Sequence, residues 1–346
     1  MKKIALIIPY FGKFPNYFYL NLLSIAKNPE ITWFFFTDDY SEYDWPSNTK
    51  VHYMSFSELQ NLVQSRFDFK ISLDRPYKLC DFKPAYGVIF SDYLQEYTFW
   101  GHCDLDIIWG DLKKYLTEQI LTEYDFIFRE GHLRLYRNID EINYLFKKKG
   151  SIFSYKEVFS KPESYGFDEA LSIQRIAERQ KVKLYHDDNV VADIESFVKP
   201  LYIRRITKKR WSDEAGIFRN ISNYQYQIFK WESGKIFRCY LNYGKINIDE
   251  FMYLHLMKRK MHTDQISQNA ESFLIVPDAF LQENNTSALT IDSIRVLSQA
   301  DNSGVKREKT IAKIIRKLKK ICSLSIRERN VILKKRFYFI IEKLIS

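Results

Sequence analysis

Short apolar runs that alternate with helix-like stretches constrain the fold of the first 130 residues. The runs at 3–8, 31–36, 51–56, 97–108 and 124–129 have the length of buried strands. Helical periodicity or a helix-start signal marks 16–26, 84–97 and 112–121, with Pro84 in a first turn and Asp111 as a cap. This alternation predicts an α/β fold whose central sheet is mostly parallel and is flanked by helices. With 346 residues and 46% hydrophobic content, the chain can bury a sizeable core.

Two carboxylates interrupt an otherwise apolar, strand-like stretch at 99–110. Residues two apart on a strand point to the same face, so Asp104 and Asp106 are expected to project together from a buried strand end. Two buried like charges are costly unless a cation shares them, and carboxylate oxygens suit Mg²⁺ or Mn²⁺. The alternative interpretation is a strand end whose two Asp side chains are capped or solvated.

Polar loops follow the predicted strands at the same edge of the sheet. The loops at 9–13 and 37–40 and the Asp104–Asp106 pair all lie at carboxyl ends of strands, where open α/β sheets bind ligands. We therefore predict a nucleotide pocket there, although the chain contains neither a Gly-x-Gly-x-x-Gly nor a Walker loop.

Cysteine usage and hydropathy indicate the compartment. The cysteines are scattered without a C-x-x-C pair, at Cys80, Cys103, Cys239 and Cys322. This pattern argues against a disulfide scaffold or a zinc knuckle and fits a reducing cytoplasm. The apolar run before Pro9 is too short for a signal peptide, and no stretch has the length of a transmembrane helix.

Positive charge is concentrated at the C-terminus. Residues 305–346 contain 14 Lys or Arg and 3 Glu, whereas the other 304 residues contain 39 basic and 40 acidic side chains. Isoleucines and aromatic residues recur there at helical spacing between the basic ones. We therefore expect a basic amphipathic helical tail that docks on an anionic membrane surface, with packing on its own domain as the alternative. A near-neutral main domain gives no reason to expect nucleic-acid binding.

Five segments, in this order, resemble GT-A fold nucleotide-sugar glycosyltransferases of the bacterial capsule and lipopolysaccharide biosynthesis type. They are 4–12, 81–87, 100–106, 166–171 and 253–259. The resemblance covers about residues 1–265 and implies a GT-A catalytic domain at 1–275. Its nucleotide-binding half is 1–130 and its acceptor half 131–275, followed by a linker at 276–304, rich in Asn, Ser, Asp and Gln, and the tail at 305–346.

The resemblance also implies roles for individual residues. The implied metal ligands are Asp104, Asp106 and His255, the implied donor-binding residues are Pro9, Tyr10, Phe11, Asp38, Lys83, Asp104 and Lys258, and the implied catalytic residues are Asp168 and Glu169. Several of these residues have a structural alternative, and Lys258, which could meet the diphosphate together with Lys260, would otherwise belong to a solvated basic turn. Tyr10 and Phe11 would pack in a core, Lys83 would pair with Asp81, the two acids would stabilise a first helical turn, and His255 would be a satisfied buried histidine.

The predicted function is transfer of a hexose from a nucleotide sugar, expected to be UDP-linked, to a bacterial surface-glycan or lipid-linked acceptor. Mn²⁺ or Mg²⁺ would assist departure of the diphosphate. The enzyme would work in the cytoplasm, at the inner face of the cell membrane. Stereochemistry stays open between inversion and retention. The alternatives are a nucleotidyltransferase acting on sugar phosphates and a non-catalytic, membrane-associated assembly factor.

Overall fold

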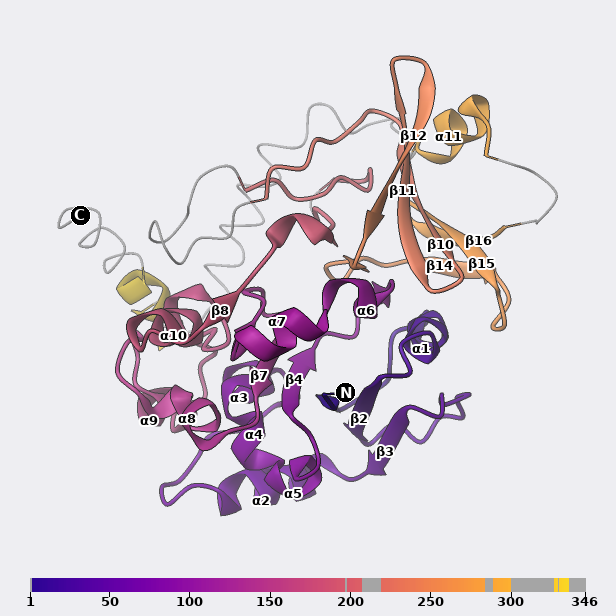
Figure 1. The fold of residues 1–346 in the computed structure, drawn as a ribbon. Coiled ribbons are helices and arrows are strands. Elements are labelled where there is room, and N and C mark those ends of the chain that lie inside the picture. The colour runs from indigo at the N-terminus through magenta and orange to yellow at the C-terminus, as the bar shows by residue number, and fades with distance from the viewer. Residues whose placement is uncertain are drawn as a thin grey trace.

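A computed structural model describes residues 2–196, 198–206, 219–283, 289–299, 327–328 and 330–335 of the protein. Over these residues the chain forms a mixed α/β structure with three β-sheets (Figure 1). The largest sheet has the order β3-β2-β1-β4-β7-β6-β8 within the described residues. Its strands are β1 (Ile4–Tyr10), β2 (Ile31–Thr37), β3 (Thr49–Tyr53), β4 (Phe99–Cys103), β6 (Phe126–Ile127), β7 (Leu133–Arg137) and β8 (Leu184–Tyr185).

Parallel pairing dominates this central sheet. β1 pairs in parallel with both β2 and β4, and β2 pairs in parallel with β3. β7 lies antiparallel between β4 and β6, and β6 pairs in parallel with β8. The predicted α/β class with a mostly parallel sheet is therefore confirmed. Because β2 and β4 lie on opposite sides of β1, the strand order reverses at β1, which creates a crevice at the carboxyl ends of β1 and β4.

The continuous apolar runs of β1 and β2 are explained by burial on both faces. Alternate residues, such as Ile7 and Phe36 on one face and Leu6 and Phe35 on the other, enter two separate hydrophobic clusters. Helices cover both clusters, with α2 (Phe56–Ser65) over the first and α1 (Phe18–Ala26) over the second. The N-cap of α2 is Ser55, which forms a capping box with Glu58.

The remaining helices are shorter than the sequence predicts. The predicted helix at 84–97 is broken into α4 (Tyr86–Ile89) and α5 (Ser91–Leu94), after α3 (Leu79–Phe82) and a 3₁₀ turn at Lys83–Ala85. The predicted helix at 112–121 is likewise divided into α6 (Leu112–Tyr115) and α7 (Glu118–Glu123), capped by Asp111 and Thr117. The other α-helices that the structure describes before residue 290 are α8 (Asp140–Asn143), α9 (Tyr155–Phe159) and α10 (Arg175–Arg179).

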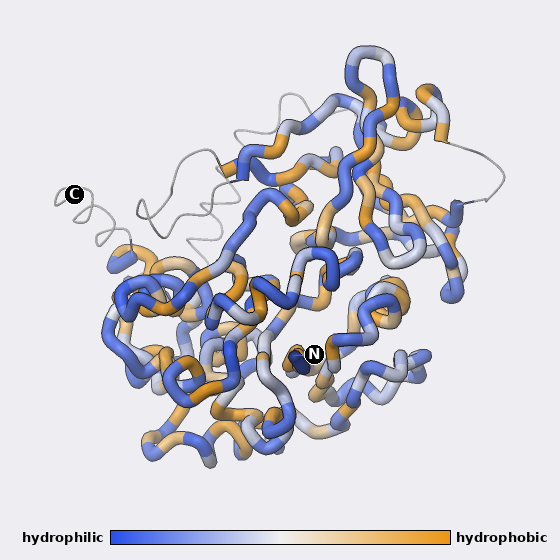
Figure 2. The backbone as a smooth tube through the Cα atoms, viewed as in Figure 1, coloured by the Kyte–Doolittle hydropathy of each residue, from blue (hydrophilic) through white to orange (hydrophobic). Residues whose placement is uncertain are grey.

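A second, largely antiparallel sheet packs on the other side of α1. Its order is β12-β11-β10-β15-β16-β14, and its strands are β10 (Gln227–Glu232), β11 (Lys235–Asn242), β12 (Lys245–Phe251), β14 (His262–Gln265), β15 (Ser272–Val276) and β16 (Ala279–Gln282). β10 and β11 form a hairpin, with Ser233 and Gly234 as its turn. Hydrophobic and hydrophilic residues alternate along the adjoining β11–β12 hairpin (Figure 2), as expected for strands with two different faces.

The expected linker at 276–304 needs correction over its described residues. The expected start of the linker, residue 276, is the last residue of β15, and β16 follows directly. Further on, α11 (Ile291–Leu297) buries Ile294 against the second sheet. The polar composition of this stretch therefore reflects exposed faces and turns of a packed element rather than a plain linker.

The expected strand through Asp104 and Asp106 also needs correction. β4 ends at Cys103, and β5 (Ile107–Trp109) belongs to a small third sheet with β13 (Tyr253–His255) and β9 (Val191–Asp193). Asp104, Leu105 and Asp106 therefore form an irregular connection between two sheets. Their side chains share a site because the chain bends there, and not because of strand alternation.

Most of the expected basic tail lies outside the described residues. Residues 327–328 and 330–335 are helical and lie beside α9, where Val331 enters the core cluster that contains Val158 and Phe159 (Figure 1). No helix that the structure describes combines the length and the apolar character needed for a membrane span.

Candidate functional site

A cleft of about 1540 Å³ lies at the carboxyl ends of β1 and β4. The segment that enters β7 and the loop that follows β13 complete its walls. The predicted site residues that line it are Pro9, Tyr10, Phe11, Lys83, Asp104, Asp106, Asp168, Glu169, His255 and Lys258. Asp38 is not among the lining residues. Its carboxylate accepts a 2.7 Å hydrogen bond from the Gly12 N–H and thereby fixes the loop after β1.

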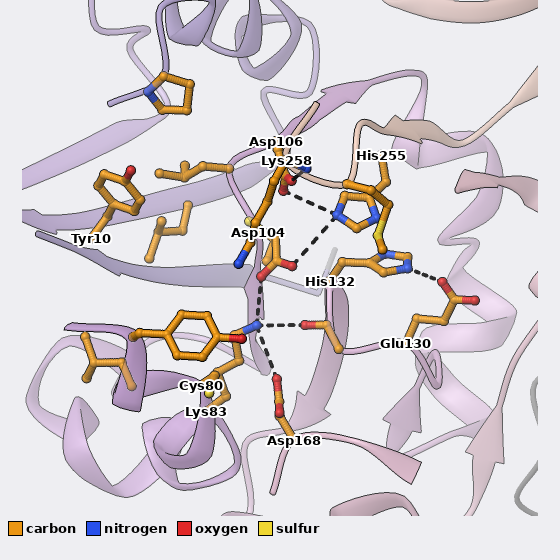
Figure 3. Close-up of a pocket in the computed structure, with 18 of the residues that line it drawn as sticks. Tyr10, Cys80, Lys83, Asp104, Asp106, Glu130, His132, Asp168, His255 and Lys258 are labelled. Carbon is orange, nitrogen blue, oxygen red and sulfur yellow. Dashed lines mark hydrogen bonds and ion pairs between the residues drawn. The ribbon is translucent and has the colours of Figure 1, made fainter. Parts of the chain in front are cut away.

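Asp104, Asp106 and His255 converge in this cleft (Figure 3). His255 Nε2 lies 3.3 Å from Asp106 Oδ1 and 3.9 Å from Asp104 Oδ2. One ligand atom from each of the three residues lies within 4.8 Å of the others. Two carboxylates and one imidazole are a donor set that fits Mn²⁺ or Mg²⁺.

Backbone pairing determines the position of His255. In the small sheet, His255 on β13 pairs with Ile107 on β5 and with Asp193 on β9. Asp193 Oδ1 lies 2.9 Å from His255 Nδ1, so the ring presents Nε2 to Asp104 and Asp106. A carboxylate on the distal ring nitrogen is the usual arrangement around a metal-binding histidine, because it fixes both ring orientation and tautomer.

The charges of this cluster favour a cation. Burial by itself would lower the pKa of His255, but hydrogen bonds to Asp106 and Asp193 raise it to about 10. Burial likewise opposes ionisation of Asp106, yet its contact with His255 and the Lys258 N–H lowers its pKa to about 2. The imidazolium thus supplies the positive charge that a metal ion would supply between these carboxylates.

A buried polar network supports His255 from behind. The His132 ring stacks on that of His255, with 4.3 Å between centroids, and its Nδ1 lies 2.7 Å from the Tyr253 hydroxyl. His132 Nε2 pairs with Glu130, which also pairs with Arg219. His132, Asp193 and His255 also have metal-ligand spacing. Asp193, however, is engaged by Arg219 at 3.1 Å, by Arg204 at 2.9 Å and by His255. These groups therefore serve as supports.

The loop after β13 closes over Asp106. The Lys258 N–H donates to Asp106 Oδ2, and the Leu256 N–H donates to the Asp106 carbonyl at 2.8 Å. Met257 and Lys258 both have positive φ, at 51° and 59°, which non-glycine residues adopt at an energetic cost. The Lys258 ammonium lies 4.7 Å from the Tyr77 ring centroid across the cleft.

Lys83 links the acidic pair to the predicted catalytic acids. Its Nζ donates to Asp104 Oδ1 at 2.8 Å and to the Gly131 carbonyl at 3.0 Å, and it lies 3.4 Å from Asp168 Oδ2. Burial opposes the charged form, but Asp104 and Asp168 hold the pKa of Lys83 well above its ordinary value. The alternative that Lys83 pairs with Asp81 is wrong, because Asp81 is taken by Lys78 at 2.8 Å.

Asp168 and Glu169 differ in environment. Asp168 is buried against Lys83, and burial together with nearby carboxylates raises its pKa to about 7. Glu169 is exposed. Both precede the π-helical turn at Ala170–Gln174, and Glu169 at its N-cap makes no side-chain capping hydrogen bond. Stabilisation of a first helical turn therefore does not explain this pair.

Tyr10 and Phe11 combine cleft lining with internal packing. Tyr10 stacks on Phe14, with 5.1 Å between ring centroids, and its hydroxyl donates to the Lys13 carbonyl at 3.1 Å. Phe11 is buried and meets Phe56 edge-on. Both rings therefore pack against other side chains, as the structural alternative predicts, and both also line the cleft.

Sequence reasoning missed the supporting residues Glu130, His132, Asp193 and Arg219. A signal was present for Asp193, since Val190, Val191, Ala192 and Ile194 surround it with an apolar strand-like run. The same logic that singled out Asp104 and Asp106 applies to it. Glu130 and His132 follow the strand at 126–127, whereas nothing local marks Arg219.

Fold and cleft together define an α/β protein with a combined carboxylate and histidine site at a sheet switch point. The chain belongs to a family of unknown function, DUF6625, whose model matches residues 6–284. Among curated proteins, no match was found.

Two solved structures share part of the chain's layout. One is the apo form of glycosyltransferase GlyE from Streptococcus pneumoniae TIGR4, which is 15% identical in sequence and has a TM-score of 0.31. The match covers 54% of this chain and 46% of GlyE. The other is the apo form of mouse xyloside xylosyltransferase 1, which is 8% identical in sequence and has a TM-score of 0.32. The match covers 57% of this chain and 88% of the mouse chain.

Proposed function

We propose that the protein is a metal-dependent glycosyltransferase that moves a hexose from a nucleotide sugar to an acceptor hydroxyl. The observation that carries the proposal is the convergence of Asp104, Asp106 and His255 in the cleft at the β1–β4 switch point. The five-segment sequence resemblance, which includes all three residues, supports it independently.

The three residues would hold Mn²⁺ or Mg²⁺. When bound, such an ion neutralises charge that develops on a departing nucleoside diphosphate. Asp106 is the first ligand candidate, because its pKa is low and His255 lies beside it. Asp104 is the outer ligand or the partner of ribose hydroxyls, since its side chain is 37% exposed and bonded to Lys83.

The other predicted residues divide between donor and acceptor. Pro9, Tyr10 and Phe11 form the wall for a nucleotide base, expected to be uracil, and Lys258 and Lys260 face the diphosphate. Lys83 binds a donor sugar hydroxyl or phosphate oxygen while it keeps Asp104 in position. Asp38 is a donor contact only if the loop after β1 rearranges, because Gly12 occupies its carboxylate.

Transfer forms a bond from the acceptor oxygen to the anomeric carbon and breaks the bond from that carbon to phosphate. If the reaction inverts, Asp168 accepts the acceptor proton, since its pKa of about 7 suits a general base. If the reaction retains configuration, the same carboxylate and Glu169 orient the sugar and stabilise its positive charge. The class of acceptor is a bacterial surface glycan or a lipid-linked oligosaccharide.

The test is calorimetric titration of the full chain with UDP, in the presence and absence of Mn²⁺. We expect UDP binding that depends on the metal and that Asp106→Asn weakens by roughly 10- to 100-fold. Asp44→Asn is the matched control, because Asp44 is exposed and does not line the cleft. Absence of UDP binding with Mn²⁺ present would sink the proposal.

Hydrolysis products separate the rival enzyme classes. Incubation with UDP-glucose or UDP-galactose should release free hexose and UDP slowly in the absence of acceptor. Pyrophosphate formation from UTP and a sugar 1-phosphate would instead identify a nucleotidyltransferase. An assembly factor would catalyse neither reaction.

Membrane docking of the tail is a separate proposal. Of the tail residues that the structure describes, Glu328, Val331 and Lys334 contact the domain itself, whereas Leu333 is exposed. Sedimentation of the full chain with anionic and with zwitterionic vesicles tests it. We expect salt-sensitive binding to anionic vesicles alone, and equal recovery from both would contradict docking by charge.

A further inference from the structure

The described helical residues 327–328 and 330–335 are anchored beside the wall of the cleft that carries Asp168 and Glu169. Val331 is buried in the core cluster that contains Phe153 and Phe159. Lys334 Nζ lies 3.8 Å from Glu157 Oε1 on α9 and 4.7 Å from the Phe153 ring centroid. Glu328 lies 4.0 Å from Arg75. The anchor therefore has an apolar contact and two charged contacts.

Lys335, the next residue, points into the cleft instead. Successive residues of an α-helix point about 100° apart, so two adjacent lysines serve different surfaces. Lys335 is half-buried and is one of the residues that line the cleft. A methyl group on Gly166 would meet Lys335 Nζ at 3.2 Å and Glu169 Oε2 at 3.0 Å. The ammonium and the carboxylate therefore lie over the same glycine.

Gly166 leaves room for both charged groups because it has no side chain, and its φ of +62° also favours glycine at this position. Among the described residues, none forms an ion pair within 4.0 Å with Lys335. By contrast, the cations deeper in the site, such as Lys83, are fully engaged by carboxylates. Lys335 is thus a positioned cation on the Asp168–Glu169 wall with its charge available to a ligand.

We propose that Lys335 is a specificity-determining residue that binds an anionic group, a phosphate or a carboxylate, on the sugar acceptor. This inference rests on the proposed function, because it assigns the acceptor side of the same cleft. Lys258 and Lys260, which line the cleft from the loop after β13, leave the donor diphosphate with cations of its own. A charge-assisted hydrogen bond from Lys335 selects acceptors that carry negative charge next to the reacting hydroxyl.

The experiment uses the full chain saturated with UDP and Mn²⁺, so that the donor side is filled. Calorimetric titrations then compare glucose 1-phosphate, glucuronate and glucose as acceptor-side probes. We expect Lys335→Ala to weaken binding of the anionic probe by roughly tenfold and to leave glucose binding unchanged. Lys334→Ala is the matched control, because its side chain faces Glu157 and Phe153, and it should change binding less than about twofold.

The two anionic probes identify the chemistry. Selective loss with glucose 1-phosphate assigns phosphate, and selective loss with glucuronate assigns carboxylate. Equal weakening of charged and neutral probes would overturn the proposal in favour of a structural role beside Glu169. Failure of the loaded wild-type protein to bind any anionic probe would overturn it as well. UDP binding, which neither lysine variant should change, keeps these outcomes separate from failure of the proposed function.

Discussion

Asp193 and His255 are joined by a 2.9 Å hydrogen bond between Oδ1 and Nδ1, across the parallel pair β9–β13. Because Nδ1 is occupied, Nε2 is the ring nitrogen that faces Asp104 and Asp106. Asp193 is fully buried and also contacts Arg219 and Arg204. Burial by itself would raise its pKa, but His255, His132 and Arg204 hold it well below the ordinary value. The nitrogen that His255 presents to the proposed metal position is therefore set by Asp193, which lies on the opposite side of the ring.

Asp193→Asn should weaken Mn²⁺ binding about 10- to 100-fold, because the amide holds the imidazole less firmly and without charge. Calorimetric titration of Mn²⁺ into the protein in the presence of excess UDP measures the effect, with Asp44→Asn as control. Thermal unfolding run in parallel separates the two roles. Lower stability with unchanged Mn²⁺ affinity would make Asp193 a structural residue only.

If the reaction inverts, activity should rise with pH through neutrality. A base works when deprotonated, and the pKa of Asp168 is raised to about 7 by burial and nearby carboxylates. With saturating metal, kcat/KM should fall about tenfold per pH unit well below pH 7 and reach a plateau above it. Asp168→Asn should lower the plateau by about 10²- to 10⁴-fold. If the pH profile of the residual activity keeps its inflection near 7, another group is the base.

Asp39 should contribute stability that depends on its charge. It is buried, and although burial would raise its pKa, hydrogen bonds from Lys13, Ser41 and the Phe14 N–H hold that pKa well below the ordinary value. A depressed pKa means that the contribution is complete above the unfolded-state pKa of about 4 and is lost as pH falls. Asp39→Asn should therefore cost about 2 kcal/mol at pH 7.

Urea unfolding at pH 7, 5.5 and 3.5 measures this cost relative to wild type. The difference should be equal at the two higher pH values and smaller at the lowest. Asp44→Asn provides the baseline. A cost that stays constant down to pH 3.5 would show that shape, and not charge, is what Asp39 contributes.

Gly101 should tolerate no side chain. A Cβ there would collide with the Arg134 carbonyl and lie 2.6 Å from Leu135 Cδ2 on β7. Gly101→Ala should destabilise the protein by about 3 kcal/mol, because backbone must shift in the central sheet. Gly244→Ala, with open space around it but a φ of +72°, should cost about 1 kcal/mol. Equal midpoints in urea for the two variants would refute the steric argument.

Local sequence signals predicted the elements that can be recognised from their own residues alone. The apolar runs predicted at 3–8 and 31–36 correspond to β1 and β2, because both faces of these strands are buried. The helix predicted at 84–97 is too long, because the chain turns at Phe90 between α4 and α5. The signal from Pro84 marked a 3₁₀ turn that leads into these short helices.

The sequence by itself determined the α/β class and the residue types of the site, since burial, periodicity and a pair of carboxylates are local properties. Tertiary structure alone decided which charges meet. Lys83 bonds to Asp104 and lies near Asp168, and not Asp81, because the connection after β4, the Gly131 carbonyl 48 residues further along the chain and Asp168 all meet at its ammonium. It also placed Asp38 against Gly12, Asp193 behind His255 and Lys335 over Gly166. Which charges pair depends on their distance in space, and the pattern of residues along the sequence does not contain that distance.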